Sequence, residues 1–124
     1  MVYRDKEIYN TFALKAVAAN YVEYCSLDEL LLDIADAPRP WLHVGGGGNL
    51  LFATERYEGT VFHNAMNAVE VVGRDSDSVT VRADGGVVWD FFVQWCVSHG
   101  YYGAENLSLI PGEVGAAAVQ NLGA

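Results

Sequence analysis

The hydrophobic pattern of the first half of the chain predicts a β-α-β unit. Residues 21–25 and 41–44 have the β-branched and aromatic composition of short strands. Between them, residues 27–35 place apolar side chains at the i, i+3, i+4 and i+7 spacing of a helix that buries one face. The side chains expected on that face are Leu27, Leu30, Leu31 and Ile34. Ser26 and Glu29 form a capping box, in which each side chain is expected to accept a hydrogen bond from the other residue's backbone N–H.

The rest of the pattern predicts further strands and a second helix. Extended segments are expected at residues 1–10, 59–64, 68–72 and 79–83, the last being a half-buried hairpin partner after a turn at 75–78. From Trp89 to Cys96 apolar residues recur at helical spacing, which predicts an amphipathic helix of about three turns ending at Gly100. Asp90 is interpreted as a residue on the surface of this helix.

Four consecutive glycines, Gly45 to Gly48, lie between the strand at 41–44 and a second apolar run. Without Cβ atoms, this stretch can adopt positive φ and let a bound group approach its N–H groups, so it is interpreted as a diphosphate cradle. A flexible turn between two strands remains an alternative. Because the glycines follow the second strand of the β-α-β unit, a Rossmann fingerprint is disfavoured. A P-loop is excluded because no lysine follows Gly48.

A second unusual stretch runs from Glu105 to the end of the chain. It carries no charged residue after Glu113 and is crowded with small residues, which would let a planar ligand lie against the backbone. The alternative is an alanine-rich buried helix over residues 116–120, with the Pro-Gly pair at 111–112 as its entry turn.

Composition narrows the class of protein. With 124 residues, 52% of them hydrophobic, the chain can form a core of one domain or part of a larger protein. Seven Lys and Arg against 16 Asp and Glu give a net charge of −9, which argues against nucleic acid and anionic membranes as partners. The charged N-terminus and the absence of a long apolar run predict a cytoplasmic protein.

Neither the cysteines nor the histidines suggest a metal site. Cys25 and Cys96 lie in apolar segments and are expected to be buried, reduced thiols. The three histidines, His43, His63 and His99, do not have the spacing of metal ligands, so no metal is predicted.

Taken together, the two small-residue stretches point to a family. The sequence resembles the N-terminal half of the UDP-N-acetylenolpyruvoylglucosamine reductases, or UDP-N-acetylmuramate dehydrogenases, of bacterial cell-wall synthesis. The matching segments are Asn10-Thr11-Phe12, Gly45 to Leu51, Trp89, Glu105 to Leu107, Ile110 to Ala117 and Gln120 to Ala124. The resemblance implies an α+β, FAD-binding fold of the vanillyl-alcohol-oxidase (PCMH) type with two small lobes. Residues 1–72 would form the first lobe and 73–124 the start of a second, truncated lobe.

The resemblance also implies a cofactor site. The glycine loop would hold the FAD diphosphate through Gly45, Gly46, Gly47, Gly48, Asn49 and Leu50. The second stretch would line the isoalloxazine ring and its linker through Pro111, Gly112, Val114, Gly115, Ala116, Gln120 and Asn121. The family usually has serine at the position of Gly48, so one hydroxyl donor to the diphosphate is missing here. Ala118 likewise replaces a common proline, and Glu113 a small residue.

The implied reaction is an NADPH-dependent reduction in peptidoglycan synthesis. NADPH reduces the flavin, which passes hydride to the enolpyruvyl double bond of a UDP-sugar and gives UDP-N-acetylmuramate. The catalytic residues of the family come after the Gln-Asn-x-Gly-Ala motif, so none is assigned in this chain, which is expected to be an inactive fragment of a flavin-dependent oxidoreductase. The alternative is a non-catalytic nucleotide- or protein-binding module that keeps the flavin fold.

Such a fragment is expected to self-associate and to bind FAD weakly or not at all. Truncation of the domain would expose apolar side chains that pack against the missing lobe in the whole protein. The residues expected to be exposed are Leu107, Leu109, Ile110 and Val119.

Overall fold

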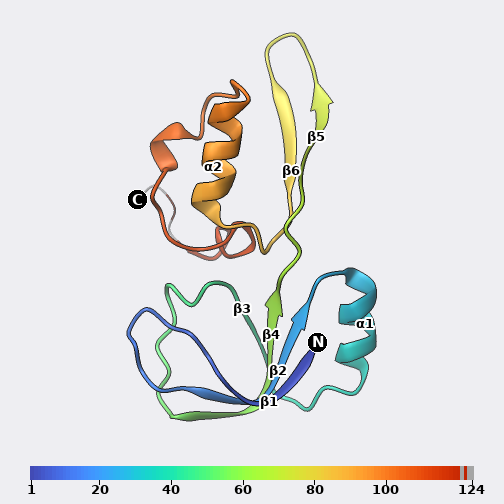
Figure 1. Cartoon of the computed structure of the whole chain (residues 1–124), viewed down its shortest axis with the longest axis vertical. Helices are drawn as coiled ribbons and strands as arrows, with labels where there is room; N and C mark the ends of the chain where they lie inside the picture. Colours follow the sequence, from blue (N-terminus) through green and yellow to red (C-terminus); the bar gives the residue numbers. More distant parts are fainter. Residues whose placement is uncertain (121, 123–124) are drawn as a thin grey trace. The chain divides into compact units, whose positions relative to one another are not determined.

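The computed structural model describes residues 1–120 and residue 122, which form two compact units with mixed α and β structure. The first unit is Met1–Ala65 and the second begins at Met66. This division comes earlier in the chain than the predicted lobe boundary at residues 72–73, and the assignment of lobes stays a prediction. The elements (Figure 1) are β1 (Val2–Glu7), β2 (Val17–Tyr24), α1 (Leu27–Ala35), β3 (Trp41–Val44), β4 (Arg56–Asn64), β5 (Val69–Arg74), β6 (Val79–Ala83), α2 (Trp89–Ser98), η1 (Glu105–Leu107) and η2 (Val114–Ala116).

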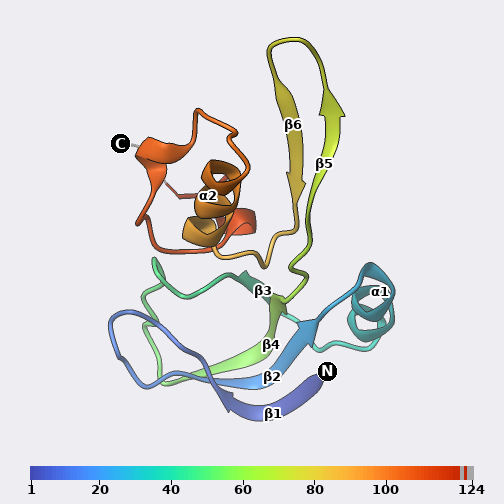
Figure 2. The same ribbon diagram turned by 45° about the horizontal axis from the view of Figure 1, so that its top comes forward.

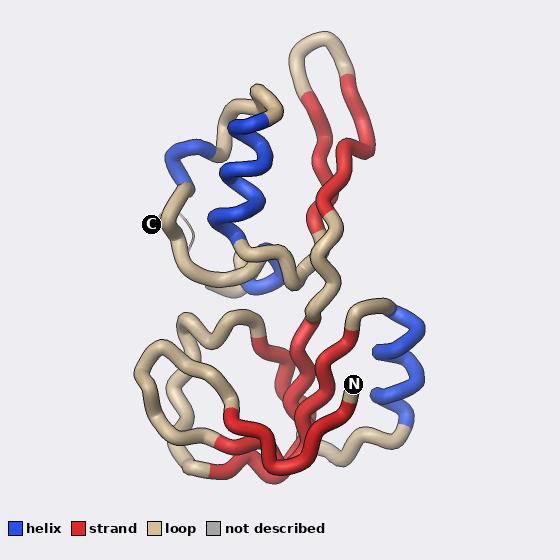
Figure 3. Tube along the Cα trace, viewed as in Figure 1, coloured by secondary structure: helices blue, strands red, loops and turns tan. Residues whose placement is uncertain are grey.

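The first unit is built on a four-stranded sheet in the order β1-β2-β4-β3. β1 is antiparallel to β2, whereas β4 is parallel to both β2 and β3. The strands are the red segments in Figure 3. The predicted β-α-β unit is therefore confirmed as β2-α1-β3, with β4 inserted between its two strands. β2 and β4 both begin earlier than the sequence pattern predicts.

The core of this unit lies on the two central strands. Val22 of β2 and Val61 and Phe62 of β4 are fully buried, as expected for strands covered on both faces. Two buried polar side chains on these strands are satisfied by backbone carbonyls. Asn20 Nδ2 donates to the Gly59 carbonyl at 3.2 Å, and Thr60 Oγ1 donates to the Pro38 carbonyl at 2.7 Å.

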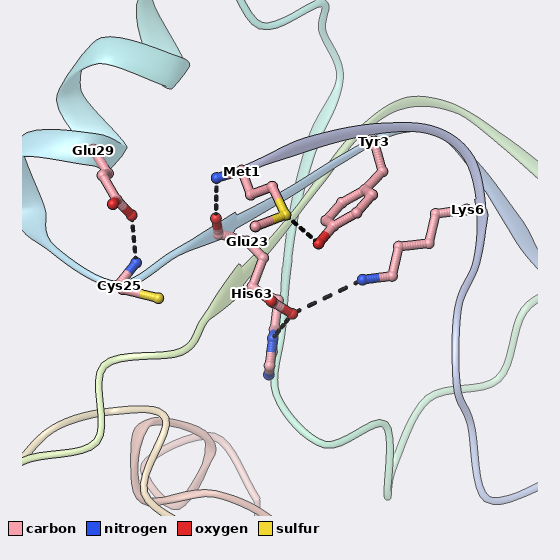
Figure 4. A network of polar contacts seen from close by, with 7 residues as sticks. All are labelled: Met1, Tyr3, Lys6, Glu23, Cys25, Glu29 and His63. Carbon is pink, nitrogen blue, oxygen red and sulfur yellow. Dashed lines mark hydrogen bonds and ion pairs between the residues drawn. The ribbon is translucent and has the colours of Figure 1, made fainter.

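One face of the sheet carries a charged network centred on Glu23 (Figure 4). Glu23 of β2 and His63 of β4 are register partners, and Oε2 of Glu23 lies 3.4 Å from Nδ1 of His63. Lys6 of β1 brings Nζ to 3.9 Å from the same carboxylate. That Nζ also lies 4.2 and 4.1 Å from the ring centroids of Tyr3 and Tyr21, so cation–π contacts add to the ion pair. The network ties three strands together.

The predicted bounds of helix α1 are confirmed, but only one of the two predicted hydrogen bonds of its capping box is present. Ser26 Oγ accepts from the Glu29 N–H at 3.2 Å, as predicted. The Glu29 carboxylate, however, accepts from the Cys25 N–H at 2.7 Å and not from that of Ser26 (Figure 4). Cys25 comes directly after the last residue of β2, so the carboxylate satisfies a donor that has just left the strand. The thiol of Cys25 is exposed, and the expectation of a buried thiol there is wrong.

The predicted burial of the apolar face of α1 is also wrong. No residue of this helix is buried, and Leu27 and Leu31 are 63% and 67% exposed. Leu30 and Ile34 are half-buried. Helical spacing determines which side chains share a face of α1. Burial of that face requires other residues to cover it, and the described residues leave much of it uncovered.

The second unit opens with the predicted hairpin of β5 and β6 (Figure 2). Its turn is organised by Asp75, whose Oδ1 accepts from the N–H groups of Asp77 at 2.9 Å and Ser78 at 2.7 Å. The hydroxyl of Ser78 and then these two backbone bonds hold the pKa of the Asp75 carboxyl below its ordinary value. The turn at 75–78 is therefore confirmed as a side-chain-directed turn.

The structure of α2 confirms the predicted apolar stripe along the helix and the predicted glycine at its C-terminal end. Val93 and Cys96 are buried on the stripe. Gly100 follows with φ +72°, its N–H donates to the Val97 carbonyl at 3.0 Å, and the N–H of Tyr101 donates to the Cys96 carbonyl at 2.9 Å. This pair of bonds is a Schellman motif, which satisfies carbonyls that the helix leaves free at its end.

Candidate functional site

The glycine loop follows β3 directly, and one of its residues can only be glycine. Gly47 is buried and has φ +72°. A Cβ built on Gly47 would lie 2.2 Å from the Tyr9 carbonyl oxygen, so any side chain would collide with backbone. The loop is thus fixed against the chain that follows β1 at this point.

Gly48 differs from Gly47 in both respects. A Cβ on Gly48 would meet nothing within 4 Å, and its φ is not in the left-handed region. Gly46, Gly48 and Asn49 are exposed, and none of their N–H groups donates a hydrogen bond to another described residue. Free backbone donors in a glycine-rich turn form an anion-binding concavity. The loop therefore presents backbone donors that are not used within the described residues.

The structure brings the motif Asn10-Thr11 onto this loop. The Thr11 N–H donates to the Gly47 carbonyl at 3.2 Å, and Thr11 Oγ1 donates to the Gly48 carbonyl at 3.1 Å. Asn10 is 4% exposed and closes its own loop, since Nδ2 donates to the Leu14 carbonyl at 2.8 Å and Oδ1 accepts from the Leu14 N–H at 3.1 Å. In the sequence this motif contributed to the family resemblance, but no contact was predicted for it.

In the second unit, residues 112–116 are docked along residues 85–89. Three backbone hydrogen bonds join the two segments: Val114 N–H to the Val87 carbonyl (2.8 Å), Gly115 N–H to the Gly85 carbonyl (2.9 Å) and Trp89 N–H to the Gly112 carbonyl (2.9 Å). A Cβ on Gly115 would lie 3.0 Å from both Cα and O of Gly85. Gly85 is therefore the partner of the predicted flavin segment, a role that the sequence did not reveal.

The structure also brings Gln120 together with the Pro-Gly pair. Gln120 Nε2 donates to the Pro111 carbonyl at 3.3 Å, and its backbone N–H donates to the Ala116 carbonyl at 3.2 Å. Gly112 has φ +125°, and a Cβ there would lie 3.0 Å from Gln120 Nε2. Asn121, the other predicted residue of this pair, lies outside the described residues.

The small-residue stretch does not form the alternative alanine-rich helix. Residues 114–116 form a 3₁₀ turn, and Val119 is 87% exposed. The N–H groups of Val114, Gly115 and Ala116 all donate to protein carbonyls, that of Ala116 to Glu113 at 3.0 Å. These donors are engaged, so the segment would contact a ligand through its shape.

The first turn of α2 holds the loop that leads into this segment. Asp90 Oδ1 accepts from the Leu109 N–H and the Ser108 hydroxyl, both at 2.7 Å, and Oδ2 accepts from Gln94 Nε2 at 2.6 Å. These three bonds, that of Leu109 foremost, hold the pKa of the Asp90 carboxyl below its ordinary value. Trp89 Nε1 donates to the Leu107 carbonyl at 2.9 Å. Asp90 is thus an anchor of the loop and more than the surface residue that the helical pattern predicts.

The described residues also bear on the predictions for the cysteines, for metal ligands and for membrane-spanning helices. Burial raises the pKa of the Cys96 thiol, which lies on the apolar stripe of α2 as predicted. No group of three or more His, Cys, Asp or Glu side chains among the described residues is arranged to hold a metal ion. Across the same residues, no helix combines the length and the apolar character needed to cross a membrane.

Comparison with known proteins places the chain in a family. A family model described as FAD binding domain matches residues 23–124. The chain is 54% identical to a UDP-N-acetylenolpyruvoylglucosamine reductase of Bacteroides fragilis strain YCH46, over 94% of the chain and 35% of that protein. Proteins of the same name from Porphyromonas gingivalis and Thermobifida fusca are 40% and 42% identical, over 93% and 94% of the chain and 35% and 33% of their own lengths.

These similarities confirm the resemblance that the motifs indicated. The chain spans about a third of the length of the relatives it matches (33 to 35%). The matched family implies an FAD-binding fold of the PCMH type, and the mixed α and β elements agree with it. The chain therefore belongs to the FAD binding domain family, which supports FAD as its cofactor.

Proposed function

We propose that the chain is the FAD-binding part of an NADPH-dependent reductase that converts UDP-N-acetylglucosamine enolpyruvate to UDP-N-acetylmuramate in peptidoglycan synthesis. The observation that carries this proposal is the 54% identity to a reductase of that name over 94% of the chain. The glycine loop adds independent support, because its geometry suits the anionic part of the cofactor.

The proposed diphosphate site uses backbone donors. The net charge of the chain is −9, so a bound anion is held mainly by dipoles and not by a cluster of positive side chains. Gly46, Gly48 and Asn49 are exposed residues whose N–H groups donate to no other described residue, which fits this requirement. The neighbouring residues assigned to the same site are Gly45, Gly47 and Leu50.

The proposed flavin segment acts by shape. Its N–H groups are engaged with the protein, and its small side chains leave room for a planar ring against the backbone. The residues assigned to this part are Pro111, Gly112, Val114, Gly115, Ala116, Gln120 and Asn121. When bound, FAD would supply the hydride relay between NADPH and the enolpyruvyl double bond. The role of this chain is to bind and orient the cofactor.

The chain alone is proposed to be inactive in the complete reaction. It corresponds to about a third of the reductases it matches (35% of the Bacteroides fragilis protein). Binding of the UDP-sugar and protonation of the substrate carbon are assigned to the remainder of the whole protein.

The test is to purify the full-length reductase containing this chain and record its flavin spectrum. We expect bound FAD, and oxidation of NADPH that depends on the enolpyruvyl UDP-sugar. A protein that stays colourless after addition of FAD would contradict the proposal. A protein that binds FAD but does not oxidise NADPH with this substrate would favour the non-catalytic module.

A further inference from the structure

We infer that Thr11 is a positioning residue for the diphosphate site: it holds the carbonyls of Gly47 and Gly48 and so directs the N–H groups of Gly48 and Asn49 toward the ligand. The inference rests on the proposed function. It adds a residue from another loop that the family assignment did not connect with the cofactor.

Thr11 contacts two successive peptide groups of the glycine loop. In a trans peptide the carbonyl and the N–H of the next residue point in opposite directions across a rigid plane. The Gly47 carbonyl accepts from the Thr11 N–H, so the N–H of Gly48 points away from Thr11. The Gly48 carbonyl accepts from Thr11 Oγ1, so the N–H of Asn49 also points away. One threonine therefore orients two successive donors.

Thr11 can do this because its own loop is fixed. The buried Asn10 closes residues 10–14 with two side-chain hydrogen bonds to Leu14, at 2.8 and 3.1 Å. The Tyr9 carbonyl packs against the Cα of Gly47, where a Cβ would lie 2.2 Å from its oxygen. The backbone at Thr11 and at Gly47 is thus held by contacts within the protein.

The hydroxyl matters most at Gly48. No neighbour within 4 Å would touch a Cβ there, so sterics alone do not fix this peptide group. Without the Thr11 hydroxyl, the Gly48 carbonyl can rotate outward and present its negative end to a diphosphate. A glycine peptide makes this rotation easily because its φ and ψ are little restricted.

The test compares Thr11→Val, Thr11→Ser and Thr54→Val in the full-length reductase. Thr54 is a matched control, because it is also exposed and its Oγ1 donates to a backbone carbonyl, that of Arg56, at 2.9 Å. We expect T11V to weaken FAD binding roughly five- to tenfold, the effect of one lost hydrogen bond in an anion site. T11S and T54V should keep the wild-type affinity.

A second readout separates positioning from general stability. The ³¹P resonances of the bound diphosphate should shift in T11V and stay unchanged in T54V, with equal unfolding temperatures for the two apo proteins. Equal FAD affinity and equal ³¹P spectra for T11V and T54V would overturn the inference while leaving the proposed function intact. Absence of FAD from the wild-type protein is a different result, which contradicts the proposed function itself.

Discussion

Gly85 and Gly115 lie so close that a Cβ on Gly115 would be 3.0 Å from the Cα of Gly85. The Gly115 N–H donates to the Gly85 carbonyl at 2.9 Å, so the contact is between two backbones. Neither partner can move aside as a flexible side chain would. This contact fixes the predicted flavin segment on the segment that leads into α2.

Replacement of Gly115 by alanine should therefore destabilise the second unit. We expect Gly115→Ala to lower the free energy of unfolding by about 1–3 kcal/mol, as for overpacking at a rigid site. Gly48→Ala is the control, because its Cβ enters open space, and it should change stability by less than about 0.5 kcal/mol. Chemical denaturation of the chain measures both, and equal stability of the two variants would contradict the prediction.

A serine at position 48 should improve cofactor binding. The open space at Gly48 accommodates the side chain, and the added hydroxyl supplies one more hydrogen-bond donor to the proposed diphosphate site. We expect Gly48→Ser to tighten FAD binding about fivefold, the value of one additional hydrogen bond. Titration of the apo reductase with FAD measures the change, and an unchanged or weaker affinity would count against the diphosphate assignment of this loop.

The neighbouring glycine should behave in the opposite way. At Gly47 the positive φ and the collision with the Tyr9 carbonyl both oppose a side chain. We expect Gly47→Ala to cost about 2 kcal/mol or more of stability and to weaken FAD binding. Thermal unfolding of G47A beside G48A tests this, and a G47A protein as stable as G48A would refute the described loop geometry.

Protonation of Asp90 should loosen the loop at 108–109. The pKa of the Asp90 carboxyl is lower in the folded protein than in the unfolded chain, where it is about 3.9. The ionised carboxylate therefore stabilises the fold above that unfolded pKa, and this stabilisation is lost as the pH falls through the folded pKa. We expect Asp90→Asn to reduce stability at neutral pH and to show a shallower loss of stability below about pH 4 than the wild type. Urea unfolding between neutral and acidic pH measures this.

The control for Asp90 is Glu7→Gln, which removes an exposed carboxylate of β1. Its unfolding curves should follow those of the wild type over the whole range. If D90N shows the same acid dependence as the wild type, the bonds to Ser108 and Leu109 do not contribute to stability.

Exposed leucines should govern self-association of the isolated chain, which remains a proposal. Leu31 on α1 and Leu109 are 67% and 84% exposed. We expect the chain to form oligomers at high concentration, and Leu31→Lys with Leu109→Lys to reduce them without loss of folding stability. Light scattering over a concentration series tests this, and a monomeric wild-type chain would contradict it.

Local signals in the sequence were sufficient for much of the fold. The helix bounds at Leu27 and Ala35, the hairpin of β5 and β6, and the glycine end of α2 each depend on residues within a few positions of one another. Capping residues, turn residues and periodic apolar side chains encode such features directly.

Features that depend on distant residues were not predictable in the same way. Thr11 meets Gly48 across 37 positions, and Asp90 meets Leu109 across 19. No periodicity or local motif encodes either pair. The exposed face of α1 has a related cause, because the spacing of its leucines does not determine whether another surface covers them.

The position of β4 has a consequence for the order in which the first unit can fold during synthesis. β3 pairs with β4 and not with β2, so the ribosome makes the outer strand of this edge before the strand that joins it to the sheet. A nascent chain that has not yet released residues 56–64 leaves β3 without a partner in the sheet. Folding of this unit is therefore delayed until β4 has emerged, and during that interval an unpaired strand is open to pairing with other chains.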